Sequence, residues 1–284
     1  MNPLISVADL ATALASARPP LVLDVRFPPS SAGHAAYQEE HIPGAVFLDR
    51  DAVLAGPPGT EPGPAGGRHP LPDPAALQEA LRSLGVSADH PVVAYDEGGV
   101  PPGGSVSRAW WILRWAGHPD VRVLDGGFAA WKRDGRPTTV EVVEKQPGDV
   151  TVRPGALPVL DAAGAAETAA TGVLIDARAA VRFRGEEEPL DPVAGRIPGA
   201  RNLFYADTIG PDGRFLPAEE LRGRIAEVVG DAGTVGTYCG SGITAAHLAL
   251  AMTVAGYGTP ALYVGSWSEW ITDPDRPIAK GPAT

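Results

Sequence analysis

The sequence predicts an α/β fold of two tandem domains, each with a mostly parallel sheet that carries helices on both faces. Its 284 residues are enough for two ordinary domains at roughly 100–200 residues each. Segments of the first half recur in the same order in the second half. In both halves, short apolar runs alternate with helical patterns, which is typical of parallel sheets covered by helices.

The internal repeat is the clearest sign of domain organisation. Four pairs of segments match in the same order along the chain: Leu21–Arg26 with Val173–Arg178, Ile42–Ala45 with Ile197–Ala200, Pro91–Asp96 with Thr234–Cys239, and Val123–Phe128 with Leu262–Trp267. Chance similarity rarely preserves such an order, so we infer a duplication. The polar stretch Glu144–Val150 is the best linker, which predicts domains at residues 1–148 and 149–284.

Three buried strands are expected in each copy, because apolar runs there are bounded by Gly, Pro or Asp. They are Leu21–Val25, Val92–Tyr95 and Val121–Leu124, followed by Val173–Asp176, Val235–Tyr238 and Ala261–Val264. Apolar residues at helical spacing predict helices at Pro74–Leu84, Val106–Trp115, Ala218–Val229 and Ile243–Ala255.

Local signals refine this outline. Asp73 and Pro74 form a typical helix start, with a capping side chain and a proline in the first turn. Residues 1–18 have the pattern of an amphipathic first helix. The Gly- and Pro-rich run Gly56–Gly67 is expected to be a surface loop.

Composition narrows the function classes. A formal net charge of -11 argues against nucleic acid or an anionic membrane as the main partner. No stretch approaches the roughly 18 apolar residues of a membrane span, and the histidines lack the spacing of a zinc site. The single cysteine excludes an intramolecular disulfide and fits a reducing compartment, so a cytoplasmic protein is expected.

The cysteine lies where α/β folds place their sites. Cys239 follows an apolar strand and precedes a helix, and Gly240 and Gly242 flank Ser241 in the connecting turn. Backbone N–H groups of such a turn converge on one point, and together with the helix N-terminus they favour an anion, here a thiolate or persulfide. A lone cysteine after a strand is usually a small core residue, but packing does not explain the two glycines.

The loop Cys239–Thr244 closely resembles the active-site loop of the mercaptopyruvate-using sulfurtransferases of the rhodanese superfamily. The resemblance extends over almost the whole chain, including both Ile-Pro-Gly-Ala motifs, the stretch Val106–Trp111 and the terminal Gly265–Trp270. It implies that only the C-terminal domain keeps the catalytic cysteine. Asp96 stands at the equivalent position of the first domain, which is expected to be structural.

Some phosphatases share this fold and use a Cys-x5-Arg loop. The residue six positions after Cys239 is Ala245 and not arginine, which argues against a phosphatase.

The resemblance also implies roles for single residues. Cys239 would carry the sulfur, and Ser241 would hydrogen-bond the persulfide or the substrate. Arg182 would meet the substrate carboxylate, a group that a guanidinium binds bidentately. Further substrate-binding candidates are Gly240, Gly242, Ile243, Thr244, Arg184, Arg196 and His41.

Each of the less specific candidates also has a structural alternative. Thr244 could cap its helix, Arg184 could pair with the nearby glutamates, and His41 could lock its own turn. Two positions depart from the family pattern: Asp191 stands where close relatives often have a second arginine, and Arg196 where histidine is common. Arg196 could restore the missing positive charge or form a surface ion pair.

The resemblance implies a sulfurtransferase that moves sulfur from 3-mercaptopyruvate through a Cys239 persulfide to a small thiol, a thioredoxin-like protein or cyanide. No metal or organic cofactor is expected, since sulfur itself is the carried group. The alternatives are a thiosulfate sulfurtransferase with the same cysteine and, from another class, a non-catalytic sulfur carrier or binding module. The neutral loop favours mercaptopyruvate, because thiosulfate is a dianion.

Overall fold

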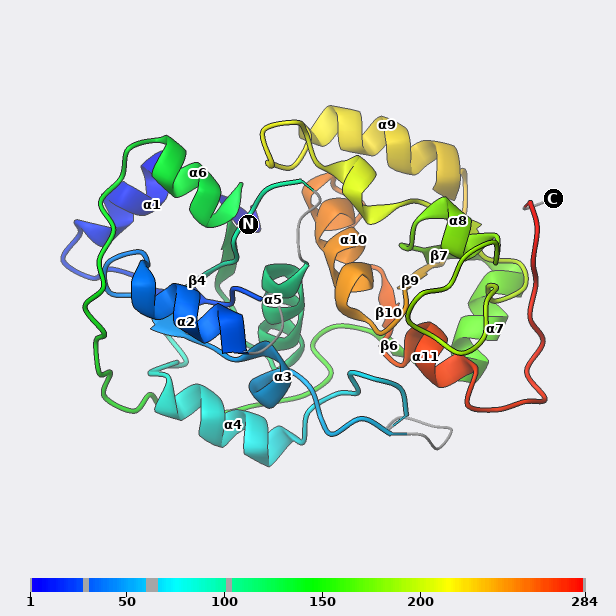
Figure 1. Ribbon diagram of the computed structural model, residues 1–284, viewed down its shortest axis with the longest axis horizontal. Helices are drawn as coiled ribbons and strands as arrows, with labels where there is room; N and C mark the ends of the chain where they lie inside the picture. Colours follow the sequence, from blue (N-terminus) through cyan, green and yellow to red (C-terminus); the bar gives the residue numbers. More distant parts are fainter. Residues whose placement is uncertain (1, 28–30, 60–65, 101–103, 283–284) are drawn as a thin grey trace. The chain divides into compact units, whose positions relative to one another are not determined.

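The computed structural model describes residues 2–27, 31–59, 66–100 and 104–282. The chain forms two compact units (Figure 1). The first consists of Met1–Ala55, Pro72–Leu157 and Ile209–Phe215, and the second of Gly56–Leu71, Pro158–Thr208 and Leu216–Thr284. Each unit therefore contains one copy of the repeat and one short segment from the other half of the chain.

The first unit is built on a five-stranded sheet in the order β1-β5-β4-β2-β3, in which all pairings are parallel. Its strands are β1 (Leu4–Ile5), β2 (Leu21–Asp24), β3 (Val46–Phe47), β4 (Val92–Tyr95) and β5 (Val121–Leu124). Its helices are α1 (Val7–Leu14), α2 (Ser31–Glu39), α3 (Arg50–Val53), α4 (Pro74–Ser83), α5 (Ser105–Trp115) and α6 (Gly127–Arg133).

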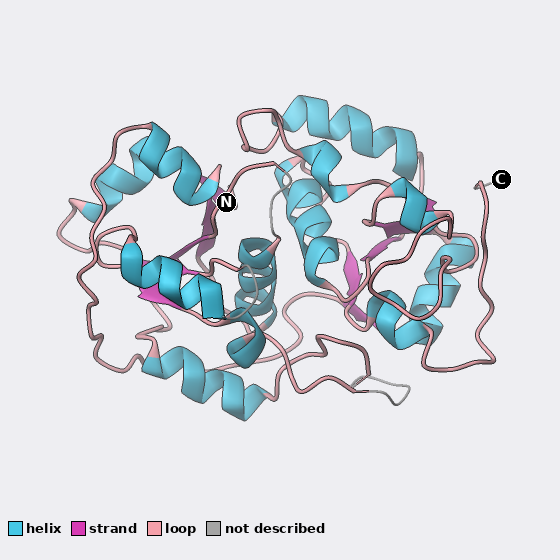
Figure 2. Ribbon diagram, viewed as in Figure 1, coloured by secondary structure: helices cyan, strands magenta, loops and turns pink. Residues whose placement is uncertain are grey.

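The second unit repeats this plan with a parallel sheet in the order β6-β10-β9-β7-β8. Figure 2 shows strands in magenta and helices in cyan. Its strands are β6 (Val159–Leu160), β7 (Val173–Asp176), β8 (Arg201–Asn202), β9 (Val235–Tyr238) and β10 (Ala261–Tyr263). Its helices are α7 (Ala162–Thr171), α8 (Ala180–Phe183), the 3-10 turn η1 (Tyr205–Thr208), α9 (Ala218–Val229), α10 (Ile243–Val254) and α11 (Ser266–Trp270).

The six strands and four helices expected from apolar patterns are all present, within one residue of their expected ends. The predicted cap is also confirmed, since the Asp73 side chain accepts hydrogen bonds from the N–H groups of Ala75 and Ala76. The helix expected within residues 1–18 is α1, which the Ser6 side chain caps. Of the expected surface loop Gly56–Gly67, residues 60–65 lie outside the described part of the chain.

The stretch expected to be a linker, Glu144–Val150, has no regular structure and is bound to the end of α4. The N–H of Gly148 donates to the carbonyl of Arg82, and that of Val150 to the carbonyl of Val86. The two compact units change over after Leu157. The boundary at residue 148 stays a prediction.

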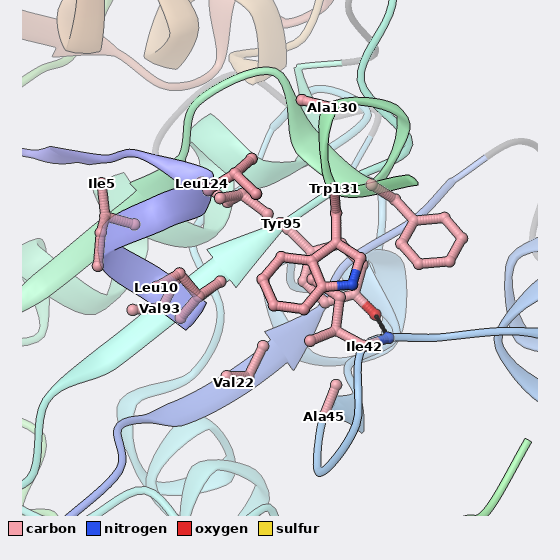
Figure 3. Packing of buried hydrophobic residues seen from close by; sticks show 12 residues of the cluster. Ile5, Leu10, Val22, Ile42, Ala45, Val93, Tyr95, Leu124, Ala130 and Trp131 are labelled. Atoms are coloured by element: carbon pink, nitrogen blue, oxygen red, sulfur yellow. Dashed lines mark hydrogen bonds between the residues drawn. The ribbon is translucent and has the colours of Figure 1, made fainter. Parts of the chain in front are cut away.

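Alternation along the strands places helices on both faces of the first sheet. Val22, Val93 and Leu124 belong to a buried cluster with residues of α1 and α6, of which Trp131 is the largest (Figure 3). The neighbours of these residues along each strand point to the opposite face of the sheet. On that face, α5 packs against β4 and β5. None of the described helices is both long and apolar enough to cross a membrane.

Candidate active site

The second sheet delivers Cys239 to its carboxyl edge, as the sequence predicts. Cys239 follows β9 directly, and α10 begins four residues later at Ile243. Gly242 makes the turn into α10 with φ +80°, a left-handed conformation that costs other residues about 1 kcal/mol or more. The cysteine side chain is therefore presented at the N-terminus of a twelve-residue helix.

Helix α11 fixes the backbone of this loop. The N–H of Trp267 donates to the Cys239 carbonyl and that of Ser268 to the Gly240 carbonyl, each at 2.9 Å. The Ser266 hydroxyl accepts from the Cys239 N–H at 3.1 Å and donates to the Tyr263 carbonyl at 2.8 Å. These hydrogen bonds hold the carbonyls of Cys239 and Gly240 towards α11. The N–H groups that follow in the loop point towards the cysteine side chain.

Two of these N–H groups point at the cysteine sulfur. The Gly242 N–H lies 3.1 Å and the Ser241 N–H 3.4 Å from Cys239 Sγ. Sulfur is a weak acceptor as a thiol and a strong one as an anion, so these two N–H groups are placed to hydrogen-bond an anionic sulfur. Cys239 is only 2% exposed, which limits solvent competition for these hydrogen bonds.

The other predicted loop residues lie around this turn. Ser241 and Ile243 are buried and Thr244 is half-buried. Within the described residues, neither the Ser241 nor the Thr244 hydroxyl has a hydrogen bond, and no side chain caps α10. The Ser241 hydroxyl therefore makes no hydrogen bond to the surrounding loop. Thr244 does not cap α10, so its structural alternative has no support.

Arg182 lies beside the loop and is held by a buried carboxylate. Its Nε and Nη2 donate to Glu188, the shortest contact being 2.6 Å. A Cβ placed on Gly240 would lie 3.4 Å from Arg182 Nη2, which brings the guanidinium next to the residue after Cys239. Burial alone would raise the pKa of Glu188, but hydrogen bonds from Arg182 and from two backbone N–H groups hold it below its ordinary value. Glu188 is therefore an anion that orients Arg182.

The same carboxylate joins Arg182 to a second buried ion pair. Arg178 contacts Glu188 at 3.2 Å and pairs with Asp176 at 2.6 Å. Charges of opposite sign thus alternate from the end of β7 to the cysteine loop. Such a chain fixes each guanidinium more firmly than an isolated surface pair does.

Arg68 is a residue that the sequence analysis did not single out. It lies in the segment Gly56–Leu71 of the second unit, and its guanidinium pairs with the buried carboxylate of Asp191. A Cβ on Gly240 would lie 2.9 Å from Arg68 Nη2. No spacing relative to Cys239 pointed to it, because 171 positions separate the two residues (239 minus 68). The departure Asp191, which also contacts Arg182 at 3.4 Å, was the one available signal, because an acid at a position where relatives often have arginine is expected to pair with a cation.

Arg184 makes the local pair that was its structural alternative. Its Nε and Nη2 donate to Glu186 at 2.7 and 2.8 Å. A third of its side chain is exposed. Nothing in these contacts directs it towards the loop, so its role in substrate binding stays a prediction.

His41 and Arg196 occupy equivalent positions in the two copies and do the same structural work. The backbone of His41 bridges to Thr139, and that of Arg196 to Ala279. Each side chain then reaches a carbonyl two residues further on, in Glu141 at 3.1 Å and Gly281 at 2.6 Å.

The remaining hydrogen bonds of both side chains are also to backbone, and each side chain packs on an aromatic ring, His41 on Tyr37 and Arg196 on Phe183. His41 Nδ1 lies 2.6 Å from the Tyr37 carbonyl, and Arg196 Nη2 donates to the Pro282 carbonyl at 3.1 Å. Through these bonds, each side chain holds the segment that follows the last helix of its own copy, and we call this role a clasp. The binding roles that the resemblance implies for them stay predictions. The surface ion pair considered for Arg196 is not found among the described residues.

The first unit shows what occupies the equivalent loop there. Asp96 follows β4 directly, and Gly104, with φ +75°, precedes α5. The Asp96 carboxylate accepts hydrogen bonds from the N–H groups of Gly98 at 3.0 Å and Val106 at 3.4 Å. Burial raises its pKa to about 6, although these two N–H groups oppose the shift. A carboxylate thus takes the place of the sulfur anion.

Comparisons with known proteins agree with this duplicated architecture. The sequence matches the family described as the rhodanese-like domain twice, at residues 6–134 and 160–273. The match covers both copies of the repeat.

Relatives match over nearly the full length of the chain. A Pseudomonas aeruginosa protein named a probable 3-mercaptopyruvate sulfurtransferase is 48% identical over 268 residues, 92% of each chain. A Mycobacterium tuberculosis protein, named provisionally as a thiosulfate sulfurtransferase, is 42% identical over 99% of this chain and 98% of its own.

Solved structures give the same result. The crystal structure of a 3-mercaptopyruvate sulfurtransferase from Escherichia coli superposes with a TM-score of 0.78 at 31% identity, covering 94% of this chain and all of the other. The prediction of a tandem sulfurtransferase is therefore confirmed. The chain belongs to the rhodanese family, as a two-domain sulfurtransferase.

Proposed function

We propose that the protein takes sulfur from 3-mercaptopyruvate, holds it as a persulfide on Cys239 and passes it to a thiol. The observation that carries this proposal is the pair of N–H groups, from Ser241 and Gly242, directed at Cys239 Sγ at the start of α10. They provide a site where an anionic sulfur is stabilised without any cofactor.

In the first half-reaction, the Cys239 thiolate attacks the sulfur of 3-mercaptopyruvate and forms a sulfur–sulfur bond. The carbon–sulfur bond breaks, and its electron pair leaves with the enolate of pyruvate. The donor's thiol proton balances the proton that the enolate carbon takes up, so the products are pyruvate and a Cys239 persulfide anion. This is covalent catalysis in which the carried group is an atom of the donor.

In the second half-reaction, a thiolate acceptor attacks the outer sulfur and leaves with it as a persulfide, which restores the Cys239 thiolate. A small thiol or a thioredoxin-like protein suits this step. Cyanide suits it equally and would leave as thiocyanate. A cytoplasmic location agrees with the lone reduced cysteine that the cycle requires.

The charges around Cys239 favour a donor with a single negative charge. Three guanidinium groups, those of Arg68, Arg178 and Arg182, are balanced by the carboxylates of Asp176, Glu188 and Asp191. With the thiolate added, the local sum is negative, so the dianion thiosulfate meets more repulsion than mercaptopyruvate does. Thiosulfate is the second candidate donor, and the name of the Mycobacterium tuberculosis relative favours it.

Steady-state turnover of 3-mercaptopyruvate and of thiosulfate, compared for the wild type and Cys239→Ser, tests the proposal. We expect a higher kcat/KM for 3-mercaptopyruvate, abolished in the variant, and a mass increase of one sulfur atom on the donor-treated wild type alone. A preference for thiosulfate would keep the cysteine chemistry and replace the donor. If neither donor is turned over, the enzymatic proposal fails and a sulfur-carrier or binding role replaces it.

A further inference from the structure

Arg68 is held next to the cysteine loop by the helix that also holds the loop. Its backbone N–H donates to the Ser268 hydroxyl at 3.1 Å, while the Ser268 N–H donates to the Gly240 carbonyl at 2.9 Å. A single residue of α11 thus links the backbones of Arg68 and of the catalytic loop. Their spacing is fixed by two hydrogen bonds.

The preceding residue explains how the segment approaches so closely. Gly67 has φ +86°, and a Cβ there would lie 2.8 Å from the Gly265 carbonyl and 2.9 Å from the Ser268 hydroxyl. Only glycine fits this contact. Gly67 also forms an antiparallel bridge with Gly59, so the backbone next to Arg68 is positioned within the second unit.

The two guanidinium groups near Gly240 share one buried acid. Asp191, with 2% of its side chain exposed, pairs with Arg68 and contacts Arg182. Asp191 engages Nη1 of Arg68, whereas Nη2 is the atom nearest to Gly240. About a third of the Arg68 side chain is exposed, so a solute can reach it.

We propose that Arg68 is a specificity-determining residue of the donor site, and that its guanidinium and that of Arg182 together bind the anionic group of the sulfur donor. The proposal rests on the proposed function. It assigns the second cation to Arg68, whereas the position where close relatives often carry an arginine holds Asp191. Asp191 acts as a positioning residue that directs both guanidinium groups to the side of Gly240.

A purely structural role for Arg68, neutralising Asp191, is the alternative that the experiment has to separate. The single variant Arg68→Gln leaves Asp191 with a weaker partner and destabilises the segment. The double variant Arg68→Gln/Asp191→Asn removes both charges and leaves a neutral pair, and its affinity is compared with that of Asp191→Asn alone, because Asp191 also contacts Arg182. Arg224→Gln is the matched control, because Arg224 forms an exposed pair with Glu220 on α9.

Two measurements are made on each variant of the full chain. The first is kcat and KM for 3-mercaptopyruvate. The second is the Kd of pyruvate for the same variants in the Cys239→Ser background, by calorimetry. Pyruvate has the carboxylate of the donor and no transferable sulfur, so this measurement does not depend on turnover. Thermal unfolding reports on folding.

We expect both the single and the double Arg68 variants to raise KM and the pyruvate Kd by about 10- to 100-fold, the usual effect of losing one charged hydrogen bond. The double variant should recover the unfolding temperature but not the affinity, and Arg224→Gln should match the wild type. If the double variant recovers the affinity as well, Arg68 is structural and the proposal is wrong. If wild-type turnover fails while pyruvate binding still depends on Arg68, the proposed function falls and the anion site stands.

Discussion

Asp96 makes the stability of the first unit depend on pH in a direction opposite to that of an ion-paired carboxylate. Asp96 is 5% exposed, and its carboxylate accepts two backbone N–H bonds and has no ion-pair partner among the described residues. Burial raises its pKa from 3.8 to about 6. Because the folded state binds the proton more tightly, the stability that this group contributes is fully present below pH 3.8. It is lost as pH rises through about 6.

The size of the effect follows from the shift. The pKa of Asp96 differs by about two units between the folded and unfolded states, and each unit corresponds to about 1.4 kcal/mol. Ionisation of Asp96 therefore lowers the free energy of unfolding by about 3 kcal/mol at pH 8. In Asp96→Asn, the amide oxygen can still accept the hydrogen bond from the Gly98 N–H. The amide NH2 group cannot accept the second bond, from the Val106 N–H, so that bond is lost. We therefore expect the variant to be about 1–3 kcal/mol more stable than the wild type at pH 8, and the gain to disappear near pH 4.

Amide hydrogen exchange of peptides that cover β4 and α5 measures this locally, which avoids treating a two-domain chain as one unfolding unit. The control is Asp89→Asn. Hydrogen bonds from Arg18 lower the pKa of that exposed carboxylate, so its variant should show no gain at pH 8. A stability difference for Asp96→Asn that is constant from pH 4 to pH 8, or a loss at pH 8, would refute the argument from burial.

Three further predictions concern the second unit. Gly240→Ala places a Cβ 2.9 Å from Arg68 Nη2, and the flexible Arg68 side chain should move away from it. We therefore expect KM for the donor to rise several-fold and the thermal unfolding temperature to change little. An unchanged KM would contradict this. Gly242→Ala should lower the stability of the second unit by about 1–2 kcal/mol in urea unfolding, because φ is +80° there. Burial lowers the pKa of His247 to about 3, so the free energy of unfolding falls as pH drops below about 6.5. Between pH 7 and pH 5, His247→Gln should reduce this fall by about 2 kcal/mol, measured by hydrogen exchange of α10.

The central strands and long helices were predictable because both copies carry the same apolar signals. The segments Val92–Tyr95 and Val235–Tyr238 are apolar runs that end at a polar or reactive residue, and the strands end there. The edge strands were not expected, since β1, β3, β6 and β8 have two residues each. So short a segment has no periodicity, and only its partner in the sheet defines it.

The site was predictable where its residues are neighbours in sequence and hidden where they are not. The loop from Cys239 to Gly242 is a local signal, because one tight turn needs its glycines and its anion together. Arg68 reaches the loop through backbone bonds to α11, and a Gly- and Pro-rich sequence carries no sign of such bonds. The equivalence of His41 and Arg196 was visible in the repeat, but their shared role as clasps depends on carbonyl groups that sequence does not locate.

The two copies together show why both loops carry an acceptor for inward-pointing N–H groups although only the second has a cysteine. A strand, a turn with a left-handed glycine and a helix start are present in both, at Gly104 and at Gly242. Inward-pointing N–H groups in such a turn would be buried without a partner if the side chain at its start were apolar. Asp96 supplies a carboxylate acceptor, and Cys239 supplies a sulfur acceptor. The same backbone requirement therefore gives a structural carboxylate in one unit and a proposed sulfur carrier in the other.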